Sequence, residues 1–177
     1  MRVFVLLADG FEEIEAVTVI DVLRRAGINV DVVSVSGTWV TGSHEVKLMV
    51  DRRLNDINFE KYDGVVLPGG SKGVNNLLKS AKLKEILEKM NEKGKLIAAI
   101  CAAPLILARH KILENKRATI YPGMEKEIPY PRGERVVVDG NVITSQGPGT
   151  AIEFALAIVE KLLGREKAFE LKKQLVA

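Results

Sequence analysis

The only cysteine of the chain, Cys101, lies where an apolar, strand-like segment, Lys95–Ile100, meets a helix-like segment, Ala102–Ala108. Small residues, Ala99 and Ala103, stand two positions to either side. This pattern is typical of a nucleophile elbow, a sharp strand-to-helix turn that exposes a nucleophile and directs backbone N–H groups at its target. A lone cysteine can also be a small buried hydrophobic residue. The strand-to-helix junction favours the first interpretation, so we predict that Cys101 is a catalytic nucleophile.

A carboxyl group is the predicted partner of this cysteine. The sequence predicts a helix from about Glu12 to Ala26, and acidic residues near its start, Glu12 and Glu13, are explained by the positive end of the helix dipole. Glu15 differs, because helical spacing places it on an otherwise apolar stripe that should face the sheet. The members of that stripe are Phe11, Val19, Val22 and Ala26. Burial there would raise the Glu15 pKa, so that a protonated carboxyl group could donate a hydrogen bond to a thiolate.

Glycines follow a buried strand at Gly64–Leu67 and form a second candidate feature. Gly69 and Gly70 could serve only a tight turn, since glycine adopts backbone angles that other residues avoid. They could also complete an oxyanion hole, in which the N–H groups of Gly70 and Ala102 converge on the oxygen of a bound carbonyl. The nearby elbow favours the oxyanion hole, and we place Gly69 beside the substrate.

A further glycine-rich turn, Gly147–Gly149, precedes a predicted helix that begins with a capping box at Thr150 and Glu153. Such a turn could hold an anion on backbone N–H groups, but it lacks the third glycine of a dinucleotide-binding fingerprint. We therefore predict that Gly147 and Pro148 form the side of the substrate pocket. The chain also has no Gly-Lys-Ser/Thr phosphate loop, and no cofactor is expected.

Histidine is scarce, and its positions narrow the chemistry. His44 and His110 are the only two, and with one cysteine they are too few for a structural zinc site; no metal is predicted. Both are expected to be exposed. Ala102 follows the cysteine, so no histidine adjoins it, and Tyr121 stands at a predicted strand end where an acid–base histidine could serve. Without a paired base, a Cys-His peptidase is the least favoured interpretation.

Apolar strands alternate with amphipathic helices along the chain. The predicted strands are residues 2–8, 30–35, 64–67, 96–100, 118–121, 135–138 and 141–144, with a hairpin at about 39–50; the predicted helices are about 12–26, 74–79, 82–93, a short segment after Cys101, 150–163 and a last helix from Glu166. Continuous apolar strands separated by helices predict an α/β fold, a mostly parallel sheet with helices on both faces. Ligands of such sheets bind at the carboxyl ends of the strands. Four turns should therefore converge there: 8–15, 67–70, 100–102 and 145–149.

Composition limits the remaining possibilities. The chain has 177 residues, which suits a single domain, and its net charge of +3 arises from lysines interleaved with glutamates. We expect no specific nucleic-acid binding. One cysteine, no run of about 18 apolar residues and no signal-like start lead us to expect a reducing, cytoplasmic setting without membrane insertion.

These motifs together resemble the ThiJ/PfpI family of the class I glutamine amidotransferase-like superfamily, closest to its parkinsonism-associated protein deglycase subgroup. The resemblance covers nearly the whole chain, residues 1–177, as a single ThiJ/PfpI-like domain. It rests on Ala8–Glu15, Asp21–Gly27, Val65–Gly70, Ala98–Pro104 and Thr144–Ala157. It implies a flavodoxin-like three-layer sandwich and a homodimer whose interface lies beside the cysteine and includes the first helix. Arg25 resembles an interface arginine of the subgroup, whereas His44 replaces a second one.

The resemblance also implies roles for the candidate residues. Cys101 corresponds to an oxidation-sensitive nucleophile, Glu15 to the carboxyl group that contacts it, and Gly70 and Ala102 to oxyanion donors. The first hypothesis is therefore a cofactor-independent glyoxalase III or deglycase, which is a hydrolase or lyase. It would act on α-oxoaldehydes or their early glycation adducts. The reaction would pass through a Cys101 hemithioacetal, with Glu15 as acid and base. The alternative is a redox-sensing protective protein or chaperone that is oxidised at a low-pKa Cys101. An intracellular cysteine peptidase remains the third possibility.

Overall fold

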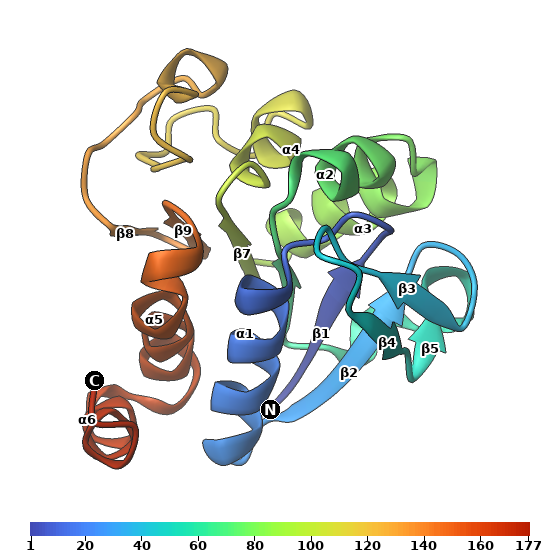
Figure 1. Cartoon of the computed structure of the whole chain (residues 1–177). Coiled ribbons are helices and arrows are strands. Elements are labelled where there is room, and N and C mark those ends of the chain that lie inside the picture. Colours follow the sequence, from blue (N-terminus) through green and yellow to red (C-terminus); the bar gives the residue numbers. More distant parts are fainter.

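Alternate residues of the central strands face opposite layers of the fold, as the pleat of a strand requires. In β1 (Arg2–Leu7), Val3, Val5 and Leu7 enter one apolar core, while Phe4 and Leu6 enter the other. Each core contains 28 buried residues. Strands buried on both faces need helices on both faces, and this is the arrangement seen in the computed structural model, which describes residues 1–177 (Figure 1).

The sheet has seven strands in the order β5-β2-β1-β6-β7-β9-β8. All neighbours are parallel except β8 and β9, which form an antiparallel pair. The other strands are β2 (Asn29–Ser34), β5 (Arg52–Arg53), β6 (Gly64–Leu67), β7 (Leu96–Ile100), β8 (Val136–Asp139) and β9 (Val142–Ser145). The predicted parallel, flavodoxin-like α/β sandwich is confirmed.

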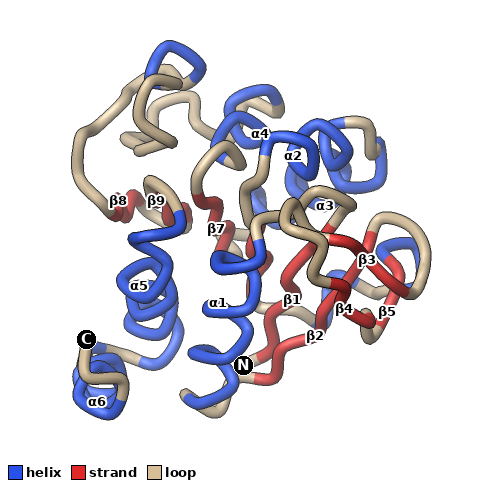
Figure 2. The backbone as a smooth tube through the Cα atoms, in the orientation of Figure 1, coloured by secondary structure: helices blue, strands red, loops and turns tan.

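Helices divide between the two faces (Figure 2). One layer contains α1 (Glu13–Arg25), α5 (Ala151–Leu163) and α6 (Arg165–Gln174), and the other contains α2 (Ser71–Leu78), α3 (Ala81–Glu92) and α4 (Pro104–Arg109). The predicted hairpin is a separate two-stranded sheet, β3 (Trp39–Thr41) and β4 (Lys47–Met49). It is tied to the start of α1, because Gly10 N donates to Thr41 O and Ser43 N donates to Phe11 O.

Two local predictions are wrong. Residues 118–121 form no strand beyond an isolated bridge between Ala118 and Pro131. The following N–H groups are not available for strand pairing, because Thr119 N donates to the Thr144 side chain and Tyr121 N donates to Cys101 O. The capping box at Thr150 is also absent. Thr150 Oγ1 bonds back to Gly147, and the Glu153 carboxylate pairs with Arg135.

Candidate active site

Cys101 follows the last residue of β7 in a backbone conformation that is uncommon for any residue but glycine, with φ of +64°. Neighbouring segments hold it there: Cys101 N donates to Ser145 O at 2.9 Å, and Cys101 O accepts from Tyr121 N at 2.9 Å. The turn ends at α4, whose first residue is Pro104. The thiol is therefore presented by a sharp, pinned strand-to-helix turn, as the elbow pattern predicts.

Glu15 lies fully buried on α1, on the apolar stripe predicted from its spacing. Gly69 N donates to its Oε2 at 2.6 Å, while Oε1 is buried without a protein hydrogen-bond partner. Burial raises the pKa of Glu15 to about 7, although the Gly69 N–H and the Cys101 side chain each act to lower it. The predicted raised pKa is thus confirmed, and Glu15 exchanges its proton near neutral pH.

The Cys101 thiol differs from the low-pKa group expected. Burial and the negative charge of Glu15 raise the Cys101 pKa to about 12, against the opposing effect of N–H groups from Gly70 and Ala102. The expectation fails because it counted the backbone donors and a neutral Glu15, but neither the burial of the thiol nor a charged Glu15. Glu15 and Cys101 share one site, so a thiolate is favoured there only while Glu15 holds a proton.

Close packing explains the two glycines after β6. A Cβ atom at Gly69 would lie 2.5 Å from Cys101 Cβ and 2.7 Å from Glu15 Oε2, so only glycine lets these groups approach each other. Gly70 has φ of +91° and precedes α2. Its N–H and that of Ala102 both interact with the Cys101 sulfur. The fold thus brings Cys101, Glu15, Gly69, Gly70 and Ala102 together; their catalytic roles stay predictions.

The turn after β9 has a mainly structural arrangement. Gly147 N donates to Thr150 Oγ1 at 3.2 Å, and Thr150 Oγ1 lies 2.6 Å from Ser145 Oγ, so this amide is used within the turn. A side chain at Gly147 would contact the Tyr121 ring, because a Cβ atom there would lie 3.4 Å from ring carbon Cδ2. Pro148 instead lines a groove of about 390 Å³ between α1 and α5. The substrate-binding roles of Gly147 and Pro148 remain predictions.

Neither histidine is among the groups that shift the Cys101 pKa. His44 is exposed, and its Nδ1 lies 3.0 Å from Glu13 Oε2. His110 is half-buried at the end of α4 rather than exposed as predicted, and burial, together with the positive charge of Lys84, lowers its pKa. Within the chain neither histidine is paired with Cys101, and a cysteine peptidase stays the least favoured interpretation.

Glu13 ties the hairpin to the helix that carries Glu15, and the sequence analysis missed this role. Burial opposes its ionisation, but hydrogen bonds from His44 and Ser43 lower its pKa to about 2. Its Oε1 accepts from His44 N at 2.6 Å, which fastens the turn between β3 and β4 to the first turn of α1, two residues before Glu15. The sequence gave no separate signal, because Glu12 and Glu13 share a position where acidic residues are common.

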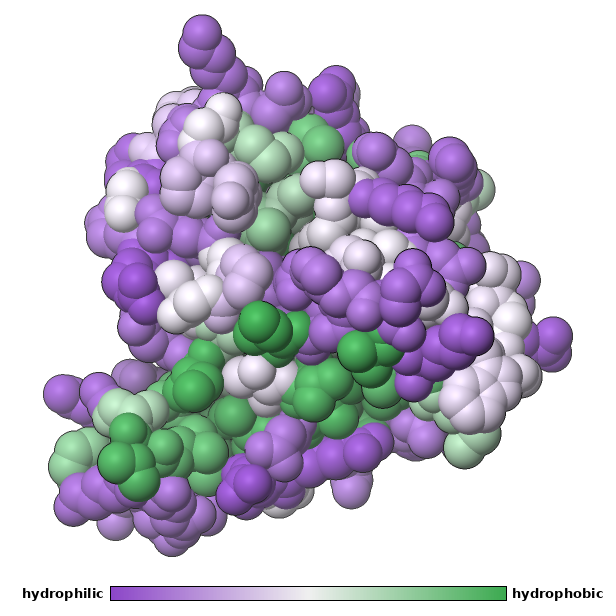
Figure 3. All heavy atoms as spheres, in the orientation of Figure 1, coloured by the Kyte–Doolittle hydropathy of each residue, from purple (hydrophilic) through white to green (hydrophobic).

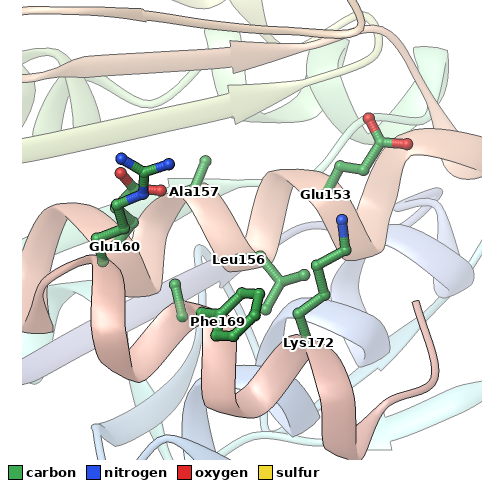
Figure 4. Close-up of a pocket in the computed structure, with 8 residues that line it drawn as sticks. Glu153, Leu156, Ala157, Glu160, Phe169 and Lys172 are labelled. Carbon is green, nitrogen blue, oxygen red and sulfur yellow. The ribbon is translucent and has the colours of Figure 1, made fainter.

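A second groove, of about 270 Å³, lies away from the cysteine between α5 and α6 (Figure 4). Leu156 and Phe169 form its apolar floor, and charged side chains, including Glu153 and Lys172, stand at its edge. It contains none of the predicted site residues. Its apolar residues with charged residues around them are what two surface helices packed together normally present. The candidate active site is accordingly the cluster around Cys101.

Comparisons with known proteins agree on one group. The profile of the DJ-1/PfpI family matches residues 1–161. The chain is 45% identical over 177 residues to Protein dj-1beta of Drosophila melanogaster, covering 97% of this chain and 95% of that protein. It is 38% identical over 167 residues to the Glutathione-independent glyoxalase DJR-1.2 of Caenorhabditis elegans, covering 93% and 89%.

Length and structure add to this likeness. Protein DJ-1 homolog B of Arabidopsis thaliana is 46% identical over 97% of this chain, but the chain spans only 40% of that protein's length. Among solved structures, oxidized DJ-1 of Toxoplasma gondii matches with a TM-score of 0.96 at 40% identity, covering 99% of this chain and 97% of the other.

Proposed function

The chain belongs to the DJ-1/PfpI family, and we propose that it is a Cys101-dependent enzyme that consumes α-oxoaldehydes such as methylglyoxal, or their early adducts with amines and thiols. The observation that carries this proposal is the buried Glu15, which exchanges its proton near pH 7 beside a nucleophile without histidine. A relative named glutathione-independent glyoxalase supports the same class of activity.

The reaction needs one proton shared by two groups. In the reactive form Glu15 is protonated and Cys101 is a thiolate. The thiolate adds to the aldehyde carbon, a C–S bond forms, and the carbonyl oxygen takes the Glu15 proton to give a hemithioacetal. The N–H groups of Gly70 and Ala102 would stabilise the developing oxyanion.

Glu15, now a carboxylate, can remove the proton from the former aldehyde carbon and return it to the adjacent keto carbon. The hydroxyl proton on the former aldehyde oxygen moves at the same time to the former keto oxygen, and the two transfers convert the hemithioacetal into a thioester of a 2-hydroxy acid. Water then attacks the thioester, gives one proton to the Glu15 carboxylate and breaks the C–S bond, which releases the hydroxy acid and restores both the thiolate and the protonated Glu15. No redox partner is needed, because one carbon is oxidised while its neighbour is reduced.

Methylglyoxal consumption by the purified protein tests this mechanism. Cys101→Ser should abolish turnover, and Glu15→Gln should lower it by at least about 100-fold, the range for loss of a general acid–base group. Glu92→Gln, on the exposed end of α3, is the matched control and should retain the activity. Wild-type rates in either site variant would refute the mechanism.

The alternative is a redox-responsive role, and one observation favours it: the matching Toxoplasma gondii structure is of an oxidized protein. Two equivalents of peroxide would convert the Cys101 thiolate to a sulfinate, which Glu15 and the two backbone donors could hydrogen-bond. Mass spectrometry after mild peroxide treatment tests this role. An absence of selective oxidation at Cys101 counts against it, whatever the outcome of the turnover assay.

A homodimer is the proposed assembly. Exposed apolar side chains gather over α1, α5 and α6 (Figure 3). Ile14 and Val17 on α1 are 56% and 45% exposed, and Ile152 on α5 is 41% exposed, beside the groove that begins at Pro148. Patches of this kind commonly mark protein interfaces. No helix of the chain is long and apolar enough to span a membrane, and we propose a reducing compartment, the cytoplasm, for its lone thiol.

A further inference from the structure

Tyr121 is tied directly to the backbone of the cysteine turn. Its N–H donates to Cys101 O at 2.9 Å, and Cys101 N donates to Ser145 O at 2.9 Å. Its own carbonyl accepts from Met124 N at 3.0 Å, which closes a turn behind it. Tyr121 is therefore held at a fixed position next to the nucleophile, although 20 residues separate the two in sequence.

The Tyr121 ring faces the side of Gly147 where a side chain would stand. A Cβ atom at Gly147 would lie 3.4 Å from ring carbon Cδ2 and 3.6 Å from Cε2, so any side chain at this position would contact the ring. The side chain is still 47% exposed, so the ring presents its free side to solvent. Because the Tyr121 main chain is pinned and Gly147 borders one side of the ring, the ring can move away from an arriving molecule only over a limited range.

We propose that the Tyr121 ring is a specificity-determining element, which limits the size of the group that can reach the Cys101 sulfur. The inference rests on the proposed function only for its substrate class: it favours α-oxoaldehydes whose keto substituent is about the size of a methyl group. A phenyl substituent would have to displace the ring. A misfit of a few carbon atoms in a rigid site is worth about 10- to 200-fold in selectivity.

Alkylation of the thiol tests access without any assumption about turnover, since the chain has one cysteine. N-ethylmaleimide and N-phenylmaleimide form the same C–S bond but differ in bulk. Tyr121→Ala should raise the phenyl-to-ethyl rate ratio by about 10-fold. Tyr121→Phe keeps the ring and should leave the ratio unchanged. Using a ratio cancels any change in the thiolate fraction, and far-UV circular dichroism checks that each variant is folded.

Tyr130→Ala is the matched control, because Tyr130 is 48% exposed and lies in the same proline-rich loop. It should leave the ratio at the wild-type value. An unchanged ratio in Tyr121→Ala, or an equal rise in Tyr121→Phe or Tyr130→Ala, overturns the proposal.

Turnover then extends the test to substrates. Tyr121→Ala should raise kcat/KM for phenylglyoxal relative to methylglyoxal by about the same 10-fold factor. If the alkylation ratio shifts but neither aldehyde is consumed by the wild-type protein, the proposed enzymatic function fails while the role of Tyr121 in access stands. If both aldehydes are consumed and neither ratio changes, the role of Tyr121 fails and the enzymatic function stands.

Discussion

Glu15→Gln should change how the stability of the protein depends on pH. The folded protein raises the Glu15 pKa from 4.5 to about 7, so the folded state binds this proton more tightly than the unfolded chain does. The resulting stabilisation is fully present below pH 4.5 and is lost as pH rises to about 7. A shift of this size corresponds to about 3 kcal/mol of unfolding free energy.

Glutamine has nearly the same shape, and its side-chain oxygen can still accept the hydrogen bond from Gly69 N. It has no proton to lose, so the charge that is costly to bury never forms. The variant should therefore gain about 3 kcal/mol relative to wild type between pH 4 and pH 8. Above pH 8 the Cys101 thiol adds its own titration, so the comparison stops there.

Urea unfolding at pH 4, 5, 6, 7 and 8, followed by circular dichroism, measures this difference directly. Glu92→Gln serves as the control, because this exposed side chain lies at the end of α3. As a surface substitution, it should differ from wild type by no more than about 0.5 kcal/mol at any of these pH values. A Glu15→Gln difference that is constant with pH would show that Glu15 is not a buried acid with a raised pKa, and would remove the basis of the proposed proton transfers.

Three further predictions concern packing and assembly. Gly69→Ala places a methyl group against Cys101 and Glu15. It should abolish methylglyoxal turnover and lower the free energy of unfolding in urea by about 1–3 kcal/mol. Gly133→Ala is the control, because Gly133 has open space around it, and it should change neither quantity. Glu13→Ala leaves the His44 N–H without its acceptor and removes the pairing with the His44 ring, and should cost about 2 kcal/mol at pH 7. Because the Glu13 pKa is lowered to about 2, this contribution should disappear as pH falls from 4.5 towards 2. Val17→Arg should turn the proposed dimer into a monomer in analytical ultracentrifugation. Val138→Arg, at an equally exposed position on β8, should leave the dimer intact. An identical mass for wild type and both variants would contradict the proposed interface.

The strands and the cysteine turn could be predicted because their signals are local. Residues 96–100 form a continuous apolar run, and small residues flank Cys101, so the strand-to-helix turn follows from neighbouring positions alone. Glu15 could be placed because helical spacing puts it on the apolar stripe of α1. For each of these predictions, the residue types and their spacing within a single strand or helix were sufficient.

Failures occurred where partners distant in sequence decide the structure. Residues 118–121 have the composition of a strand, but the N–H groups of Thr119 and Tyr121 bond to β9 and to the cysteine turn. Thr150 and Glu153 have the spacing of a capping box, yet Arg135 takes the glutamate. Glu13 looked like an ordinary first-turn acid until the β3–β4 hairpin came to lie on it.

The Cys101 pKa shows why residue types alone do not define this site. Each feature expected to favour a thiolate is near the sulfur: two backbone N–H groups and a carboxyl group able to hold a proton. The combined effect of these groups on the Cys101 pKa depends on whether Glu15 is charged. A carboxylate beside the sulfur opposes the thiolate, whereas a carboxylic acid would stabilise it. The two groups therefore titrate as one unit, which loses its first proton near pH 7 and holds a single proton above that pH. It follows that reactivity requires that proton to reside on Glu15, and that turnover should depend on Glu15 even where the aldehyde touches only the sulfur.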